Sequence, residues 1–401
     1  MDLFIAFFLV LFAFFAVSPV LLGSRWAVLP IAFAFGARIS AAIFHRYVQP
    51  LPEGSSDALV FDRVAVAWAT EYGCSGFFDH FNPSASYVYS SLMAVAYSCI
   101  DYVPFSVQVL NVLVGVFGVI FLMSATKTVW GIKYAKRVGY VLAFFPFLVM
   151  LSAVGLRESF IFSLFSLGIF SFVKYSYGKG NSWLILCLVS FGLSSLFHGA
   201  MALAIGGVFM GIMLKPMLAP IQTKQQFGFN IVLFLVMLAI FCLGMVYVYS
   251  QVSLHKLGSL DELDVDQISA VVSSRTKGNA AYLTGLEMNG LFDFLWQIPI
   301  RMFYFLFSPF PWNISSPAHV LGMLDGVFYI VISAMCFKYR KEIFNNPVLL
   351  QVLLILLLMS LAFSFGTSNF GTAIRHRAKF YLCMLIIVAP CFFGGWRRSN
   401  R

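Results

Sequence analysis

The sequence predicts an all-α protein that crosses a membrane many times. Of its 401 residues, 61% are hydrophobic and only 10% are charged, which leaves too few polar side chains to cover a soluble globule. Apolar runs near the roughly 17 to 20 residues that cross the hydrocarbon as a helix recur throughout the chain. They lack the alternation typical of a β-barrel strand. We therefore expect a single transmembrane domain, residues 1–401.

We expect about eleven spanning helices. The first run begins at Asp2 and has neither a basic start nor a clear small-residue cleavage site, so it is interpreted as a helix and not as a signal peptide. Several runs are short, and neighbours such as those within 182–214 could be tilted or broken. The expected helices cover residues 2–22, 26–44, 105–125, 138–154, 157–173, 182–197, 200–214, 228–250, 317–336, 347–366 and 379–395.

The connections between these helices differ in charge, which predicts their orientation. One set is short, holds more than half of the 26 lysines and arginines, and contains one acid, Glu342. By the positive-inside rule this set faces the cytoplasm, which also accounts for much of the net charge of +10 without nucleic acid. The other set holds two long outer loops with short interfacial helices, 45–104 and 251–316. The N-terminus is then outside, the C-terminus is cytoplasmic, and functional residues are expected on the outer face.

The first outer loop supplies the expected general base. Asp57 opens an amphipathic stretch that ends at a helix-breaking glycine. A carboxylate there could accept the proton of an attacking hydroxyl, with Glu71 or Asp62 as the fallback. For each acid the alternative is a solvated helix face. Cys74 and Cys99 lie in the same loop and could pair in an oxidising compartment, although their spacing is weak evidence.

Two further polar positions interrupt apolar sequence on the expected outer face. Arg157 and Glu158 are predicted at a turn between two helices, with Glu158 capping the second helix and Arg157 pointing inward. Arg157 is either a phosphate ligand, because its planar donors can hold two oxygens, or part of a polar hairpin turn. His198, at the outer end of a helix, is kept as a residue supporting the site; a satisfied polar group is the alternative.

The second outer loop offers basic and aromatic side chains. Arg275 and Tyr282 lie in a glycine-bounded segment that suits a sugar or diphosphate, although a plain surface loop is equally compatible. Arg301 lies in an aromatic segment expected at the membrane interface and is a candidate phosphate ligand. Trp312 is either a sugar-stacking platform or part of an aromatic belt.

The segment GTSNFGTAIRHRAKF, residues 366–380, is the most concentrated basic stretch on the expected outer face. Gly366 and Gly371 predict a tight turn whose amides, with Asn369, could hold phosphate oxygens. Its potentially cationic side chains are Arg375, His376, Arg377 and Lys379. The two arginines would bind phosphate, and the histidine would bind or protonate a leaving phosphate. The alternative is a basic loop that meets lipid headgroups.

These residues carry a resemblance to known families. The D-A-L-x-F pattern from Asp57, followed by VQVLNVLVGVFGV, the stretch at 142–162 and LFHGAMALAI at 196–205, resembles the glycosyltransferase C superfamily. FLFSPFPWNI at 305–314 and NFGTAIRHR at 369–377 resemble membrane proteins of bacterial surface-polysaccharide clusters, including O-antigen and exopolysaccharide polymerases.

The resemblance implies a glycosyltransferase of the bacterial inner membrane that uses polyprenyl-phosphate or -diphosphate sugars, with Asp57 as the base. The implied partners are a polyprenyl-linked oligosaccharide, membrane lipids and a chain-length-regulating membrane protein. The sequence departs from the superfamily pattern because no second acid stands beside Asp57, so no metal or other cofactor is expected and a divalent metal is unsupported. In a polymerase that relies on arginines, the assignment of Asp57 would fail.

Two other classes remain as alternatives. A transporter of a lipid-linked sugar predicts basic residues deep in spanning helices and two-fold internal similarity. Arg38 lies within an expected helix, and the sequence contains no repeat. A non-catalytic membrane subunit would leave the clustered outer arginines unexplained.

Overall fold

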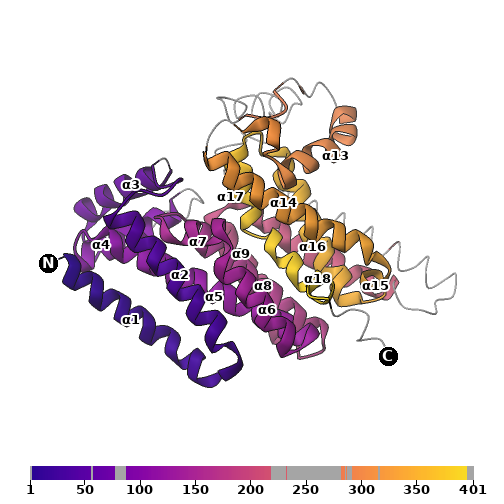
Figure 1. Cartoon of the computed structure of the whole chain (residues 1–401), viewed down its shortest axis with the longest axis horizontal. Coiled ribbons are helices and arrows are strands. Elements are labelled where there is room, and N and C mark those ends of the chain that lie inside the picture. The colour runs from indigo at the N-terminus through magenta and orange to yellow at the C-terminus, as the bar shows by residue number, and fades with distance from the viewer. Residues whose placement is uncertain are drawn as a thin grey trace. The chain divides into compact units, whose positions relative to one another are not determined.

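The chain is described by a computed structural model over residues 2–55, 57–76, 87–217, 281–284, 291–314 and 317–394, with the single positions 232 and 286. Over these residues the structure consists of helices and contains no β-strand, which confirms the predicted all-α class (Figure 1). The chain divides into two compact units: Met1–Met201 with Ala378–Arg401, called unit 1, and Ala202–Arg377, called unit 2.

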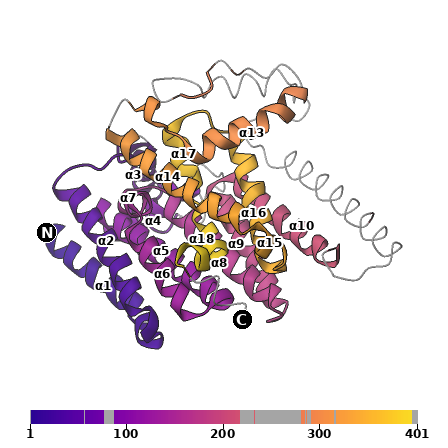
Figure 2. The ribbon, with the colours of Figure 1, turned by 45° about the vertical axis from the view of Figure 1, so that its right-hand side comes forward.

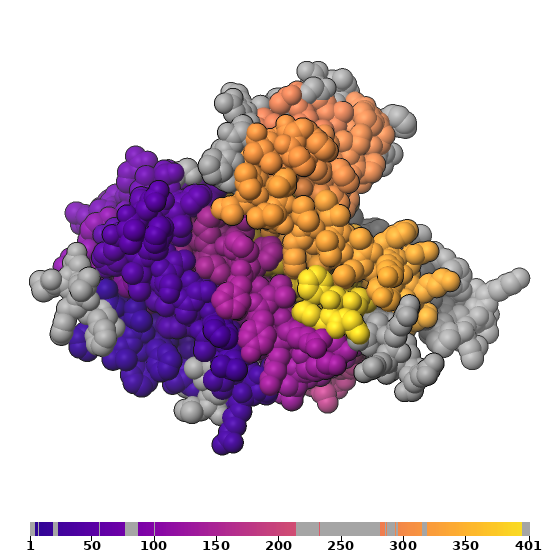
Figure 3. All heavy atoms as spheres, in the orientation of Figure 1, coloured from indigo at the N-terminus to yellow at the C-terminus, as the bar shows by residue number. Residues whose placement is uncertain are grey.

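Unit 1 is built around α5, which packs against α1, α2, α6, α7, α8 and α18. Because α5 is apolar on all sides, it is buried along most of its length. In the space-filling view, the indigo and purple side chains of the N-terminal helices form a close-packed surface on the visible face of unit 1 (Figure 3). The helices are α1 Asp2–Gly23, α2 Val28–Tyr47, α3 Asp57–Tyr72, α4 Val88–Ile100, α5 Pro104–Trp130, α6 Ile132–Phe144, α7 Pro146–Ala153, α8 Glu158–Ser176, α9 Ser182–Phe197 and α18 Met384–Phe392, with 3-10 turns η1 Arg25–Ala27 and η5 Tyr381–Cys383.

The close packing of α5 on α8 depends on a glycine. A Cβ at Gly118 would lie 2.5 Å from a ring carbon of Phe162. Since a real side-chain carbon does not approach that closely, only glycine permits this approach of the two helices.

The helix predicted at 138–154 is instead two helices, α6 and α7, bent by 58°. Pro146 opens α7 and has no N–H to donate to the carbonyl of Leu142. The buried guanidinium of Arg38 on α2 donates to that carbonyl at 3.1 Å and to the carbonyl of Ala143 at 3.4 Å. An arginine inside a spanning helix is therefore used to satisfy backbone groups that the break exposes.

Unit 2 places α16 beside both α10 and α13 (Figure 2). A Cβ at Gly207 on α10 would lie 2.9 Å from the Cα of Ile355, so this contact brings two backbones together. The helices are α10 Leu203–Met217, α13 Leu291–Phe307, α14 Pro317–Lys338, α15 Arg340–Phe344, α16 Pro347–Phe365 and α17 Phe370–Ala378, with the 3-10 turn η4 Pro311–Asn313.

Among the described residues, five helices are long and apolar enough to cross a membrane, or six if α6 and α7 form one bent span. These helices indicate a membrane protein, but they do not confirm about eleven spans. The helices expected at 182–197, 200–214 and 379–395 correspond to shorter apolar helices, and 228–250 lies outside the described residues. The five are Arg25–Tyr47, Pro104–Trp130, Glu158–Ser176, His319–Lys338 and Pro347–Phe365.

The two ends of unit 1 differ in chemistry. At the end where α5 finishes, Lys127 lies over the ring of Trp26 and Arg137 donates to the carbonyl of Phe393 at 2.9 Å. At the end where α5 begins lie α3, α4 and the turn between α7 and α8 (Figures 1 and 2). The basic short connections therefore gather away from α3, which begins at Asp57 as predicted.

Candidate functional site

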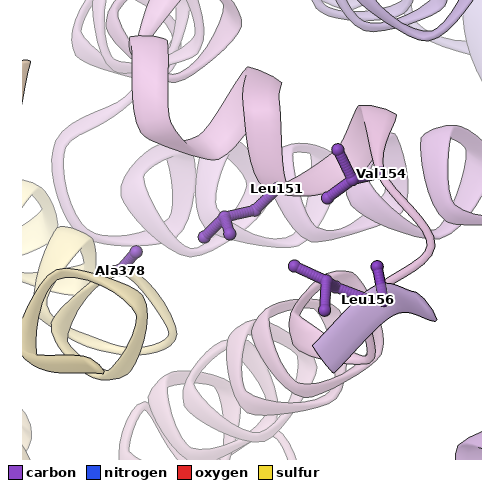
Figure 4. Close-up of a cluster of buried hydrophobic side chains, with 5 residues drawn as sticks. Leu151, Val154, Leu156 and Ala378 are labelled. Carbon is purple, nitrogen blue, oxygen red and sulfur yellow. The ribbon is translucent and has the colours of Figure 1, made fainter. Parts of the chain in front are cut away.

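A small apolar cluster in unit 1 joins the start of α3 to the α7–α8 turn. Its buried members come from α3, α7, the turn and the residue that follows Arg377 (Figure 4): Ala58, Leu151, Val154, Leu156 and Ala378. Leu51 and Phe61 pack against the cluster. Because Asp57 precedes Ala58 and Arg157 follows Leu156, the cluster brings the expected base and the expected phosphate ligand to one region of unit 1.

Arg157 and Glu158 lie at a turn between two helices, where the sequence predicted them. Arg157 is partly buried, and its guanidinium carbon lies 5.4 Å from the centre of the Phe61 ring on α3. Glu158 is the first residue of α8, where a negative charge favours the helix N-terminus.

The Glu158 carboxylate also forms a buried ion pair. Its Oε1 lies 3.5 Å from Nζ of Lys379, and the two side chains are 6% and 1% exposed. At this separation the pair is an electrostatic contact and not a short hydrogen bond. The α7–α8 turn thus carries Arg157 one residue before a carboxylate that pairs with a buried cation. Glu158 was expected only to cap its helix, and no local pattern indicated that Lys379 was its partner.

The three acids expected on α3 have different settings. Asp57 is exposed at the start of the helix, whereas Glu71 is exposed near its end. Fourteen residues of helix separate them by about 21 Å along the axis, so they cannot serve the same reacting atom. Asp62 lies between them, and its two oxygens accept hydrogen bonds from the hydroxyls of Tyr97 at 2.6 Å and Tyr102 at 3.0 Å. Asp62 therefore holds α3 to α4 and to the start of α5.

A disulfide links Cys74 to Cys99, which confirms the pairing that the sequence left open. It joins the residues after α3 to the end of α4. With the Asp62 hydrogen bonds, the disulfide makes α3 and α4 one cross-linked hairpin. His198 ends α9 and is partly buried; the preceding Phe197 stacks on Phe160 of α8 at 5.2 Å between ring centres.

In unit 2, the segment expected to be an open turn at Gly366 and Gly371 is largely a helix, α17. Asn369 caps it: its Oδ1 accepts from the amide of Gly371 at 3.0 Å and from that of Thr372 at 3.4 Å. The prediction of a tight turn at Gly371 is therefore wrong, since an asparagine cap followed by helix-compatible residues outweighs one glycine. The Gly371 amide that was expected to face a phosphate is already hydrogen-bonded.

Arg377 is completely buried in unit 2 and ties α17 to α13 and α14. Its Nε and Nη2 both reach Oδ2 of Asp325 at 2.7 Å. The remaining contacts of Nη1 and Nη2 are to backbone carbonyls, those of Phe305, Leu306, Ser308 and Gly322. Every nitrogen of this guanidinium has a partner inside the unit. Asp325 was not among the predicted residues, although an acid within an apolar helix indicates a buried pair.

Tyr282 and His376 both contact the residues that lead into α17. The Tyr282 amide donates to the carbonyl of Ser368 at 3.0 Å, and its hydroxyl donates to the carbonyl of Thr367 at 2.8 Å. Nδ1 of His376 lies 3.1 Å from Oγ1 of the same threonine. The burial of Tyr282 raises the pKa of its hydroxyl, so that it remains a donor. Arg375, which precedes His376 on α17, is partly buried.

The other candidates in unit 2 are more scattered. Arg301 is buried on α13, where it donates to Oε1 of Gln297 at 2.8 Å and to the carbonyl of Leu286 at 2.9 Å. Trp312 is 74% exposed and stacks on Phe310 at 5.0 Å between ring centres. Arg275 lies outside the described residues.

Across the described part of the chain, no group of three or more His, Cys, Asp or Glu side chains is placed to hold a metal ion. Comparison of the chain with protein-family models, curated proteins and solved structures finds no match.

Proposed function

We propose that this protein is a membrane glycosyltransferase that uses polyprenyl-phosphate- or diphosphate-linked sugars at the outer face of a bacterial inner membrane. Its proposed product is a surface polysaccharide, built by polymerising lipid-linked oligosaccharide repeats. The observation that carries the proposal is the α7–α8 turn of unit 1. There Arg157 lies over Phe61 of α3, the helix that Asp57 opens, and the next residue forms the buried Glu158–Lys379 pair.

The chemistry needs groups of these kinds at a membrane surface. An acceptor hydroxyl attacks the anomeric carbon of the donor sugar, and the bond from that carbon to the phosphate oxygen breaks. The exposed carboxylate of Asp57 accepts the hydroxyl proton. The phosphate leaves with additional negative charge, which the Arg157 guanidinium would stabilise, while the buried Glu158–Lys379 pair holds the turn that carries Arg157.

The outer location is supported by two independent features of unit 1. The Cys74–Cys99 disulfide follows α3, and disulfides persist in oxidising compartments outside the cytoplasm. The basic connections lie at the opposite end of the unit, as the positive-inside rule requires of a cytoplasmic face. Both features favour an outer N-terminus and a cytoplasmic C-terminus.

Unit 2 holds its own candidate phosphate ligands, which we propose independently of the α7–α8 turn. Arg375 and His376 are the residues of α17 that we assign to phosphate binding, and Arg377 is left to hold the unit together. Arg301, Arg275 and Trp312 stay candidates for binding the lipid-linked sugar. A chain-length-regulating membrane protein stays a proposed partner.

The test is product formation by purified protein in liposomes that contain a polyprenyl-diphosphate oligosaccharide. Wild type should give a ladder of products, and Arg157→Ala should reduce the rate by about 100-fold because it removes a transition-state contact. Asp57→Asn should lose the ladder as well. The matched control is Arg63→Ala, which removes an exposed arginine from the same helix as Asp57. A ladder retained in Asp57→Asn and lost in Arg157→Ala would assign the mechanism to the arginine alone.

A transporter of a lipid-linked sugar is the second candidate, and one observation favours it. The bent pair α6 and α7, with buried Arg38 at its break, is a discontinuous span of the kind that transporters use at their binding sites. The same liposomes distinguish the two functions. Movement of intact substrate across the bilayer, with no product, would replace the transferase proposal.

A further inference from the structure

Asn111 of α5 is a fully buried polar residue in a spanning helix, and all its contacts point to one place. Its Nδ2 donates to the carbonyl of Val154 at 2.7 Å and to that of Leu156 at 2.9 Å. With both Nδ2 hydrogens used there, its Oδ1 accepts a hydrogen bond from the hydroxyl of Tyr89 on α4 at 3.2 Å. Burying an amide in an apolar helix is costly unless such partners are present, so the residue is matched to this turn.

The α7–α8 turn needs these donors. α7 ends at Ala153 and α8 begins at Glu158, so the carbonyls of Val154 and Leu156 lie outside the hydrogen-bond ladders of both helices. Asn111 supplies a donor to the carbonyl of Val154 and another to that of Leu156, the residue before Arg157. The backbone on the N-terminal side of Arg157 is therefore fixed to α5.

Tyr89 packs against aromatic rings of the two helices beside the turn, α3 and α8. Its ring lies 5.4 Å from the ring of Phe61 and 5.8 Å from that of Phe160 on α8. Phe61 is the ring over which the Arg157 guanidinium lies. The Asn111–Tyr89 pair thus contacts both the backbone that carries Arg157 and the aromatic ring that supports its side chain.

We infer that Asn111 and Tyr89 are positioning residues for the transfer reaction: they fix the α7–α8 turn so that Arg157 and Glu158 keep their placement against α3. The inference rests on the proposed function and adds two residues to it, neither of which touches the reacting atoms. A turn released from α5 would leave Arg157 in place only part of the time. Because small displacements of a charged group lower catalysis steeply, the loss should be about 10- to 100-fold in kcat/KM.

The experiment compares Asn111→Ala, Tyr89→Phe and the control Thr126→Val in liposomes. Tyr89→Phe keeps the ring and removes only the hydroxyl, so it is the variant expected to fold normally. Thr126 is equally buried near the other end of α5, and its hydroxyl bonds only to its own helix. Two quantities are measured: hydrogen exchange of the amides between Val154 and Glu158, and kcat and KM for the lipid-linked donor.

Both positioning variants should exchange the turn amides at least about tenfold faster and lose activity, while Thr126→Val changes neither. In an Arg157→Ala background, Tyr89→Phe should cause little further loss, because it acts through Arg157. Unchanged exchange at the turn overturns the inference whatever the activity. Faster hydrogen exchange at the turn with full activity overturns it too. So does a loss of activity from Tyr89→Phe that adds in full to the loss from Arg157→Ala. If wild type makes no product while exchange responds, the proposed function has failed, and the positioning role in transfer fails with it.

Discussion

Arg377 and Lys379 stand two residues apart in one basic stretch, yet each enters a different kind of ion pair. Arg377 lies 2.7 Å from Asp325 and also donates to four carbonyls of unit 2. Lys379 lies 3.5 Å from Glu158 in unit 1, beside the turn that carries Arg157. The planar guanidinium suits the first setting because its five donors are divergent, whereas the second needs only a compact charge.

The difference shows that a cluster of cations in sequence is not one binding site. Arg377 holds helices together, and its donors are used for that purpose. Lys379 balances a buried carboxylate at the proposed phosphate site. Substitutions should separate these roles: at Arg377 the larger change should be in stability, and at Lys379 it should be in activity.

The largest effect is expected for Arg377→Ala. It leaves the buried Asp325 carboxylate without its cation, and removing one partner of a buried pair costs about 3–5 kcal/mol. Thermal unfolding in detergent should show a large loss of stability, with Arg340→Ala, an exposed arginine of α15, as the control. An unchanged melting temperature in Arg377→Ala would contradict the structural role.

Substitutions that conserve the charge should give the next largest effect, and the loss of stability should be larger at Arg377 than at Lys379. Arg377→Lys keeps the charge but cannot reach the acid and four carbonyls at once, so we expect a loss of about 2 kcal/mol. Lys379→Arg should keep most of the stability and activity because its setting needs a charge and not a donor pattern. Equal tolerance of the two exchanges, measured by unfolding and by the ladder assay, would remove the distinction.

Breaking the second pair should affect activity more than stability. Glu158→Gln and Lys379→Met each leave a buried charge unpaired. Because the two groups lie 3.5 Å apart and form no short hydrogen bond, the cost should be smaller than for Arg377→Ala, about 1–3 kcal/mol, while the ladder should be lost in both. The double variant should recover part of the stability but none of the activity. Recovery of both would show that the pair serves folding alone.

The smallest effect is expected for Asp62→Asn. Asp62 belongs to neither of the two ion pairs. The substitution weakens two tyrosine hydrogen bonds to a charged acceptor, at about 1 kcal/mol in total because the site is partly exposed. Burial and then the hydrogen bond to Asp62 raise the pKa of Tyr102. A folded-state pKa above the unfolded value gives stability that is lost as pH rises above about 10, so Asp62→Asn should flatten this alkaline loss in melting experiments.

Local sequence patterns were sufficient for several helices. The helix expected at 182–197 is α9 with the same bounds, and the amphipathic helix was predicted with Asp57 near its start, which is where α3 begins. Such predictions succeed because hydrophobic runs and flanking glycines act within a few residues. The break at Pro146 was missed because the run of apolar residues continues through it.

Composition and apolar runs were enough to predict a helical chain with long apolar helices, most of whose basic residues lie in the connections. The partners of the buried polar groups emerged from the packing: Glu158 with Lys379, Arg377 with Asp325, and Asn111 with the carbonyls of Val154 and Leu156. The physical reason is that periodicity reports whether a side chain is buried in its own helix. Which group it meets depends on how distant helices pack, and that information is absent from any local pattern.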